Sequence, residues 1–268
     1  MEIRDIPLMI LCGGKGTRLR DVTELLPKPM VSIGDQPIVW HIMKTYASFG
    51  VRRFILCLGY KKEAFADYFM NYHSRMNDFT VQLGNESKIT WQTECPEKDW
   101  EVTLAGTGLS SMTGCRVFRA SKYLQPGEKE FFLTYGDGVA DVDLEALLAL
   151  HRKTGKMLTI TAVHPESRWG LLDLKGDSVA GFQEKPTVGG DYINGGFMVM
   201  KREFVEKYLR DDPTLTLEQI PMRSAAVDGN MAAYRHEGYW QCMDNQREYL
   251  LLNELWNSSK APWTKYWK

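Results

Sequence analysis

The stretch LMILCGGKGTRLRDVTELLPKPM, residues Leu8–Met30, decides the fold of this chain. Its apolar start, within residues 6–12, has the length of a strand, and the glycine-rich turn of residues 13–16 follows directly. A strand that runs into such a turn exposes a row of backbone N–H groups, and glycine lets a phosphate approach them closely. Arg18 and Lys28 add the positive charge that a triphosphate requires. The stretch therefore indicates a nucleoside triphosphate site.

The composition excludes several other classes of protein. The chain has 268 residues, of which 44% are hydrophobic and 25% are charged, as expected of one globular domain. Its net charge of -1 argues against a nucleic-acid-binding protein. No apolar run is long enough for a membrane span, and we do not expect the N-terminus to be a signal peptide. The five scattered cysteines favour neither a disulfide framework nor a zinc site, and they fit a reducing cytoplasm.

Strand-length apolar runs alternate with helical patterns along most of the chain. The helix predicted over residues 37–49 begins at a proline and ends before Gly50. Such alternation predicts an α/β fold with a parallel sheet and helices on both faces. The glycine-rich turn then lies at the carboxyl end of a strand, where open sheets bind ligands. The other predicted helices cover residues 62–72, 144–151, 202–209, 217–228 and 246–256, and the other strands cover 54–58, 130–135, 158–163, 197–200 and 231–236.

Two segments depart from this alternation. Short alternating runs at residues 88–93 and 100–104 flank a polar turn, which predicts an antiparallel excursion. Two further runs within residues 171–186 surround Lys175-Gly176-Asp177, which predicts a hairpin in a smaller antiparallel lobe.

Asp137 is a candidate metal ligand because it stands between Gly136 and Gly138 at the end of a predicted strand. Oxygen ligands suit Mg²⁺, which usually takes one or two carboxylates together with substrate phosphates. The alternative is a hairpin turn, since Asp-Gly is a common turn dipeptide. A predicted helix with Asp143 as its N-cap follows, and it favours a β–α crossover over the hairpin.

The histidines and the C-terminal tail have structural interpretations. His41, His73 and His151 lie in or near predicted helices, and we expect them to be packed or half-exposed helix residues that take no part in catalysis. The aromatic and basic tail, residues 260–268, is expected to dock against its own subunit or a neighbouring one.

Several motifs together resemble those of the sugar-1-phosphate nucleotidyltransferases. They are GGKGTRL with PKPM in the first stretch, TGLSSMTG at residues 107–114, GDGVAD at 136–141, FQEKP at 182–186, INGGF at 193–197 and a terminal KAPW. Within that family the similarity is greatest to the glucose-1-phosphate cytidylyltransferases, and it runs from Met9 to Lys268. Leu26, Gly106, Leu109 and Cys115 depart from the patterns of close relatives.

The resemblance implies a fold, a reaction and a cofactor. It implies a Rossmann-like mixed, mostly parallel sheet flanked by helices, with the antiparallel lobe binding the sugar. In the single domain, the nucleotide-binding part is about 1–150, the sugar-phosphate-binding part about 151–245, and the C-terminal helix and tail 246–268. The implied reaction joins CTP and glucose 1-phosphate, with Mg²⁺, to give CDP-glucose and pyrophosphate. Such enzymes are homo-oligomers that supply precursors for bacterial surface polysaccharides.

The resemblance also assigns site residues. The catalytic cations are Arg18, Lys28 and Lys185, and the metal carboxylates are Asp137 and Asp244. The residues assigned to binding the sugar phosphate are Gly170, Glu184, Lys185 and Asn194. The residues assigned to binding the nucleotide are Leu11, Gly13, Gly14, Gly16, Thr17, Arg18, Lys28, Ser111, Thr113, Gly136 and Asp137. For Asp244 the alternative is an N-cap of the helix that follows it.

Two other functions and one choice of substrate stay open. The chain could be a nucleotidyltransferase for another phosphorylated acceptor, or a catalytically silent subunit that binds nucleotide sugars. Retention of the five charged residues Arg18, Lys28, Asp137, Lys185 and Asp244 speaks against the silent subunit. The base is not determined between cytosine and uracil, so UTP stays open beside CTP.

Overall fold

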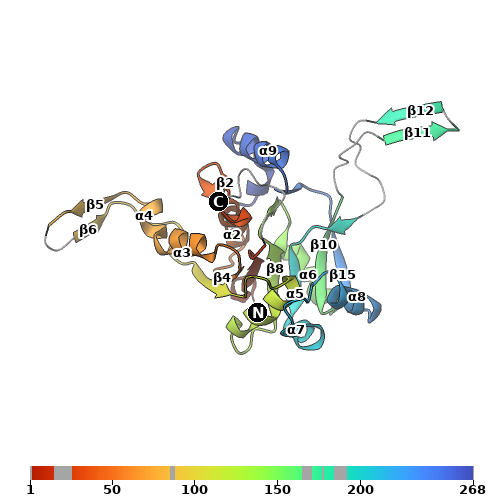
Figure 1. The fold of residues 1–268 in the computed structure, drawn as a ribbon, viewed down its shortest axis with the longest axis horizontal. Helices are drawn as coiled ribbons and strands as arrows, with labels where there is room; N and C mark the ends of the chain where they lie inside the picture. Colours follow the sequence, from red (N-terminus) through yellow and green to blue (C-terminus); the bar gives the residue numbers. More distant parts are fainter. Residues whose placement is uncertain are drawn as a thin grey trace.

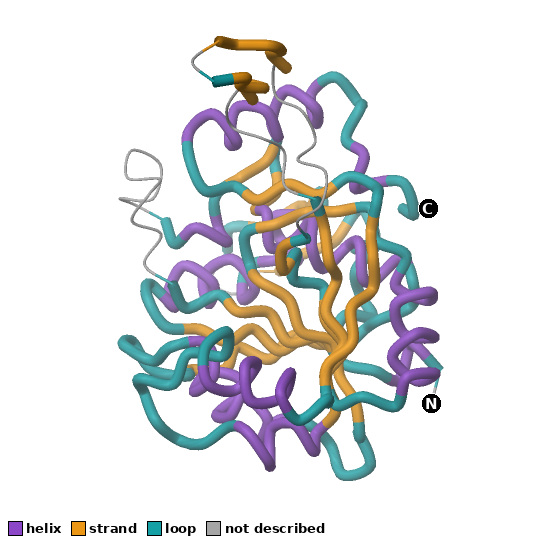
Figure 2. Tube along the Cα trace, turned by 90° about the vertical axis from the view of Figure 1, so that its right-hand side faces the viewer, coloured by secondary structure: helices purple, strands orange, loops and turns teal. Residues whose placement is uncertain are grey.

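A mixed β-sheet forms the centre of the molecule (Figures 1 and 2). The computed structural model describes residues 2–14, 26–84, 88–164, 171–176, 178–183 and 192–267. The strands of this sheet are β1 (Leu8–Leu11), β4 (Arg53–Leu58), β7 (Glu101–Gly106), β8 (Glu130–Tyr135), β10 (Leu158–Val163), β13 (Ile193–Asn194), β14 (Met198–Lys201) and β15 (Met231–His236). Their order is β13-β10-β14-β8-β1-β4-β7, and β15 pairs with β10.

Four neighbouring strands of the sheet run parallel to one another. β1 lies between β4 and β8, with Leu8 opposite Phe54 on one side and Phe132 on the other, and β7 adds to β4. β14 then runs antiparallel to both β8 and β10. The predicted mostly parallel sheet is confirmed. Because parallel strands share one direction, the carboxyl ends of β1, β4 and β8 meet at one edge.

Helices cover both faces of the sheet, as the alternation predicted. All four residues of β1 are buried, and their side chains alternate between two hydrophobic cores. Leu8 and Ile10 enter the first core, and Met9 and Leu11 enter the second. The first core takes side chains from α2 (Ile38–Ser48), α3 (Lys62–Met70), α6 (Leu144–Thr154) and α9 (Gln246–Asn257). The second takes them from α5 (Thr113–Ala120), α7 (Arg202–Tyr208) and α8 (Ile220–Val227).

Short elements lie outside the main sheet. The two-stranded sheets are β2 (Ser32–Ile33) with β3 (Gln36–Pro37), β5 (Phe79–Gln82) with β6 (Lys88–Trp91), β9 (Gly138–Ala140) with β16 (Trp240–Cys242), and β11 (Leu171–Lys175) with β12 (Ser178–Gln183). The short helices are η1 (Ile3–Asp5), η2 (Lys28–Met30), α4 (Tyr72–Met76), η3 (Ser121–Tyr123) and η4 (Pro262–Thr264). Figure 1 shows β5 and β6 as an arm that extends away from the main sheet.

Most predicted elements have the expected bounds. The strands over 130–135, 158–163 and 231–236 are confirmed to the residue, and the hairpin within 171–186 is confirmed as β11 and β12. Asp143 is confirmed as the N-cap of α6, since its Oδ1 accepts a hydrogen bond of 2.9 Å from the Ala146 backbone N–H. The β–α crossover at Asp137 therefore holds.

The predicted pairing around the polar turn of residues 94–99 is wrong. Strand β6 pairs with β5, which precedes it, while β7 joins the main sheet parallel to β4. Burial explains the difference. Ala105 of β7 is buried in the main sheet, whereas every residue of β5 and β6 is exposed. The helix predicted over 62–72 ends at Met70, and a separate short helix follows.

The C-terminal tail docks on its own chain, one of the two expectations for it. Trp263 is fully buried and packs near His41 of α2 and Trp256 of α9. His41 and His151 are buried packing residues, and His73 lies exposed against Trp91. Among the described helices, none is both long and apolar enough to span a membrane.

Candidate active site

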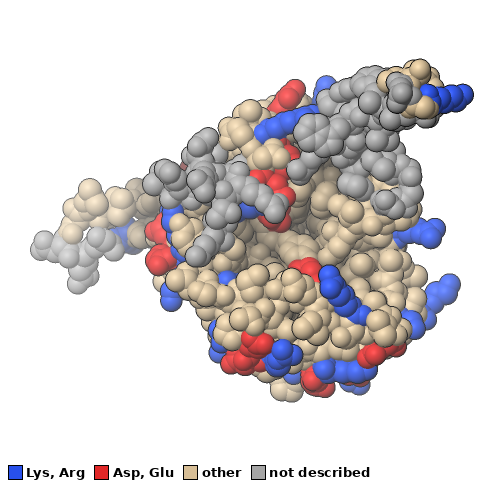
Figure 3. Space-filling view, turned by 45° about the vertical axis from the view of Figure 1, so that its right-hand side comes forward, with Lys and Arg blue, Asp and Glu red and all other residues tan. Residues whose placement is uncertain are grey.

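A cavity of about 560 Å³ opens at the edge where the parallel strands end. The face in Figure 3 is hollowed, with acidic atoms at the border of the hollow. The residues that line the cavity include some from the ends of β1 and β8, the start of α5 and the loop after β16. The lining residues are Leu11, Gly13, Gly14, Lys28, Pro29, Leu109, Ser110, Ser111, Met112, Thr113, Arg116, Tyr135, Gly136, Asp137 and Asp244. Nine of the predicted nucleotide and metal residues are therefore brought together by the fold.

Lys28 is the cation at the centre of this site. It is the first residue of η2, after Pro27, and only 9% of its surface is exposed. Its Nζ donates to Asp137 Oδ2 at 2.7 Å and also to Asp244 Oδ1. Burial by itself would lower the pKa of Lys28, but the charges and hydrogen bonds of the two aspartates outweigh burial and raise it. The ammonium therefore stays charged.

Asp137 reaches the cavity because Gly136 lets two chain segments come close. A Cβ at Gly136 would lie 2.9 Å from Pro29 Cγ and 3.0 Å from the Leu11 carbonyl oxygen, so a side chain there would push β8 away from β1. The backbone carbonyl of Asp137 accepts a hydrogen bond of 2.8 Å from the Met243 N–H. That bond ties the loop after β8 to the residue just before Asp244.

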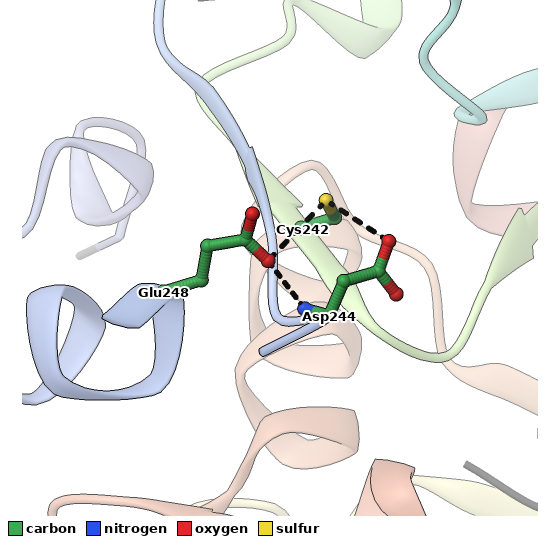
Figure 4. A group of neighbouring side chains, drawn as sticks. All are labelled: Cys242, Asp244 and Glu248. Atoms are coloured by element: carbon green, nitrogen blue, oxygen red, sulfur yellow. Dashed lines mark hydrogen bonds between the residues drawn. The ribbon is translucent and has the colours of Figure 1, made fainter. Parts of the chain in front are cut away.

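Asp244 is not the N-cap of α9, so the alternative considered for it is wrong. The cap is Asn245, whose side chain accepts a hydrogen bond of 3.0 Å from the Glu248 N–H. Glu248 Oε2 in turn accepts from the Asp244 N–H at 2.5 Å (Figure 4). Because the neighbouring asparagine caps the helix, the Asp244 carboxylate is left for the cavity.

Cys242 belongs to the same group of side chains. Its Sγ lies 3.8 Å from Asp244 Oδ2 and 3.9 Å from Glu248 Oε2. Burial, followed by the charges of Glu248 and Asp244, raises the pKa of the Cys242 thiol to about 12. The thiol therefore stays protonated and can donate to either carboxylate. The three residues hold ligand-type atoms within 4.8 Å of one another, but only Asp244 lines the cavity.

The pair Asp137 and Asp244 suits a hard divalent cation. Each carboxylate already places an oxygen on one ammonium, which acts as a stand-in cation between them. Two carboxylates against one lysine leave one net negative charge. Mg²⁺ prefers such oxygen ligands and shares them with substrate phosphates.

Arg116 is a site residue that the sequence reasoning missed. Its guanidinium donates to the backbone carbonyls of Gly13, Leu58 and Gly108 at 3.1, 3.1 and 2.8 Å, and to Thr107 Oγ1 at 2.9 Å. A Cβ at Gly13 would lie 2.1 Å from its Cζ. Gly13 therefore makes room for an arginine as well as for a ligand. The available signal was an arginine at the start of a helix, just after the small-residue segment 107–114.

Thr113, Tyr135 and Asn194 belong to a second network, whose centre Glu218 the sequence reasoning also missed. Glu218 accepts from the hydroxyls of Thr113 and Tyr135, each at 2.7 Å. Asn194 Nδ2 donates to the Tyr135 hydroxyl oxygen at 3.1 Å, which joins a predicted sugar-pocket residue to the cavity wall. Ser111 also lines the cavity, and its Oγ accepts from Arg119 at 3.0 Å.

Other predicted site residues lie outside the described part of the chain. They are Gly16, Thr17, Arg18, Gly170, Glu184 and Lys185. Their assigned roles stay predictions.

Comparison with known proteins identifies relatives that match nearly the full length of the chain. The family model described as "Nucleotidyl transferase" matches residues 8–244. A Salmonella typhimurium protein named glucose-1-phosphate cytidylyltransferase is 44% identical over 97% of this chain and 99% of its own length. A Bacillus subtilis protein named "Probable glucose-1-phosphate cytidylyltransferase" is 38% identical over 97% and 99%. The crystal structure of HddC from Yersinia pseudotuberculosis, 23% identical, has a TM-score of 0.63 over 94% of this chain and 99% of that chain, and it supports the fold alone.

Proposed function

This chain belongs to the nucleotidyl transferase family, and we propose that it transfers a cytidylyl group from CTP to glucose 1-phosphate. The products are CDP-glucose and pyrophosphate. The identity of the two substrates is supported by the likeness to the Salmonella typhimurium cytidylyltransferase, which extends over nearly the full length of both chains. CDP-glucose made in this way would supply the synthesis of surface polysaccharides.

The observation that carries the proposal is the contact of Lys28 with both Asp137 and Asp244 inside the cavity. A phosphoryl-transfer site must neutralise several negative charges at a fixed point, and this needs a cation and metal-binding carboxylates together. A subunit that only bound nucleotide sugars would not require all three. The contact therefore favours an active enzyme over a silent subunit.

The reaction is an in-line displacement at the α-phosphorus of CTP. A phosphate oxygen of glucose 1-phosphate forms the new P–O bond, and the bond to the leaving pyrophosphate breaks. The attacking oxygen is already anionic, so no general base is required. Catalysis then consists of holding two anions in line and compensating their charge.

Each cation of the site has a separate task in this proposal. Lys28 donates to the α-phosphate, where charge develops in the transition state. Arg18 and the backbone N–H groups of residues 13–16 hold the leaving pyrophosphate. Lys185 orients the attacking phosphate. Glu184 accepts hydrogen bonds from sugar hydroxyls, and Gly170 and Asn194 form the rest of the sugar pocket.

Asp137 and Asp244 hold Mg²⁺ in the proposed enzyme. Bound there, the ion balances the negative charge of the carboxylates and of the triphosphate. Glu248 keeps the backbone of Asp244 in place through the hydrogen bond to its N–H.

Two segments of the cavity wall are candidates for reading the base. One segment contributes Leu11, Gly13 and Gly14 to the lining, and the other contributes Ser111 and Thr113. Cytosine and uracil differ by an amine against a carbonyl, and a site that hydrogen-bonds this difference can discriminate by about 10⁴–10⁵. We propose CTP as the main nucleotide, and UTP is the comparison that tests it.

The enzyme is further proposed to be a homo-oligomer in the cytoplasm. The arm of β5 and β6 supports the first point, because Phe79, Val81, Ile89 and Trp91 form one exposed apolar face on it. A second copy of the chain is the proposed occupant of this face. The five free cysteines support a reducing compartment.

Pyrophosphate release is the experiment that tests the function. The protein with Mg²⁺ is incubated with CTP, UTP, dTTP, ATP or GTP, each with and without glucose 1-phosphate. We expect release with CTP only when glucose 1-phosphate is present, and its loss in Asp137→Asn. Release with CTP and a different phosphorylated acceptor would replace the proposed substrate. Silence with every nucleotide and acceptor would favour the silent subunit.

A further inference from the structure

We propose that Glu218 is a positioning residue that couples the nucleotide side of the cavity to its sugar side. This inference rests on the proposed function and adds a role for a residue outside the sequence motifs. Glu218 lies between α7 and α8, two residues before α8 begins, and it is half-buried. It does not line the cavity itself.

Both carboxylate oxygens of Glu218 are used, and each contacts a different wall. Oε2 accepts a hydrogen bond of 2.7 Å from Thr113 Oγ1, at the start of α5. Oε1 accepts one of 2.7 Å from the Tyr135 hydroxyl, at the end of β8. Thr113 and Tyr135 both line the cavity, and Tyr135 comes two residues before Asp137. One side chain therefore holds two walls at a fixed separation.

The direction of every hydrogen bond in this network is determined. The Leu217 N–H donates to Thr113 Oγ1 at 2.9 Å, so the single hydroxyl proton of Thr113 is left for Glu218. On the other side, Asn194 Nδ2 donates to the Tyr135 oxygen at 3.1 Å, so the tyrosine proton also goes to Glu218. Glu218 must then accept twice.

The Asn194 amide has one allowed orientation in the network. Its Oδ1 accepts from the Gly196 N–H at 3.0 Å, which turns Nδ2 toward Tyr135. The contacts continue from β13, through Tyr135 and Glu218, to Thr113 at the nucleotide loop.

The arrangement needs a side chain that accepts a hydrogen bond at both of its terminal atoms. Glutamine has nearly the same shape, but its NH₂ group would face one of the two hydroxyl protons. Glu218→Gln would therefore release either Thr113 or Tyr135 and break the connection between the walls. Hydrogen bonds to a charged group are worth about 1.5–3 kcal/mol, which corresponds to roughly 10- to 150-fold in an equilibrium constant.

The experiment measures how much a bound nucleotide analogue increases the affinity of the protein for glucose 1-phosphate. Glucose 1-phosphate is titrated calorimetrically into the full chain with Mg²⁺, with and without cytidine 5′-(α,β-methylene)triphosphate, which cannot be cleaved at the reacting bond. The coupling factor is the ratio of the two dissociation constants. We expect the wild type to bind glucose 1-phosphate at least fivefold more tightly when the analogue is present, and Glu218→Gln to bring this ratio within twofold of one.

Two further variants make the result specific. Tyr135→Phe removes the other end of one hydrogen bond, and it should lower the coupling factor like Glu218→Gln. Asp228→Asn is the matched control, because it makes the same change from carboxylate to amide at a residue that accepts a hydrogen bond of the same 2.7 Å length from a tyrosine, Tyr208, on the molecular surface. It should keep the wild-type coupling factor and activity.

The outcomes separate this inference from the proposed function. A wild type that catalyses the reaction but shows no coupling, or a Glu218→Gln variant that folds and keeps the coupling, would overturn the role of Glu218 alone. A wild type that neither binds the analogue nor releases pyrophosphate would instead count against CTP as the substrate. If Glu218→Gln does not fold, the decision falls to Tyr135→Phe, whose retained coupling would equally overturn the role.

Discussion

At the scale of single residues, Lys28 is the group on which the proposed chemistry depends most. Lys28→Ala should lower kcat by roughly 10²–10³, as expected for the loss of one preorganised donor to developing charge. Steady-state pyrophosphate release measures this. A decrease below about fivefold would contradict the role. Lys98→Ala is the control, since Lys98 forms an exposed ion pair with Glu94 and should leave kcat unchanged.

Gly13 and Gly14 are neighbours in the turn, but only one of them is in tight contact. A Cβ at Gly13 would lie 2.1 Å from Arg116 Cζ, whereas a Cβ at Gly14 meets nothing within 4 Å. Gly13→Ala should therefore reduce the free energy of unfolding by about 1–3 kcal/mol through overpacking. Gly14→Ala should change it by less than about 1 kcal/mol. Urea unfolding of the two variants checks the difference, and equal losses would contradict this explanation.

Single residues differ in how well the sequence revealed them. Lys28 stands between two prolines and Asp137 between two glycines, and such neighbours mark positions where a side chain can reach a ligand. Arg116 and Glu218 have no such neighbours. Their importance comes from contacts with carbonyls and hydroxyls that are distant in sequence, such as the one between Arg116 and Gly13.

At the scale of elements, the arm of β5 and β6 has two chemically different faces. Val81 pairs with Ile89 on the apolar face, and Thr80 pairs with Thr90 on the polar face. An isolated two-stranded hairpin is marginally stable in water, which makes a partner for the apolar face favourable. Ile89→Lys should therefore convert the proposed oligomer to smaller species.

Thr90→Lys is the matched control for that change. It introduces the same charge one residue further along β6, on the opposite face, and should leave the oligomer intact. Light scattering after size-exclusion chromatography gives both masses. A wild-type monomer, or the same mass for all three proteins, would contradict the proposed use of the arm.

Pairing between elements was harder to predict than the elements themselves. Alternation correctly indicated strands at residues 88–93 and 100–104, but it does not say which strand is the partner. Ala105 is buried in the main sheet, where β7 pairs with β4, and β6 pairs with β5. An alternating pattern shows which face of a strand is buried, but which strand pairs with it depends on the rest of the core.

At the scale of the whole molecule, His41 links distant parts of the chain and makes stability depend on pH. Its Nδ1 accepts from the Trp263 indole N–H at 3.3 Å and its Nε2 donates to the Ile33 carbonyl at 2.9 Å, so the ring is neutral. Burial lowers the pKa of His41 to about 4. The unfolded chain, with a histidine pKa near 6.5, therefore takes up the proton first.

The free energy of unfolding should consequently fall as the pH is lowered from about 6.5 toward 4. Each pH unit in that window costs up to about 1.4 kcal/mol per buried histidine. Burial likewise lowers the pKa of His151 to about 4, so His41→Gln should reduce the pH dependence without abolishing it. Urea unfolding between pH 4.5 and 7.5 measures the slope. An unchanged slope in His41→Gln would contradict this explanation.

The sequence by itself determined the α/β alternation, the glycine-rich turn that begins after β1, and the choice of Lys28 and Asp137 as candidate site residues, because periodicity and the placement of glycine and proline act within a few residues of chain. Only the tertiary structure decided which groups meet. Lys28 contacts Asp137 and Asp244 across 109 and 216 residues, and Glu218 joins Thr113 to Tyr135. Such contacts depend on the parallel register of β1 and β8 and on the shared cores that align the strand ends. No local pattern records that alignment, since it results from burying all the elements at once.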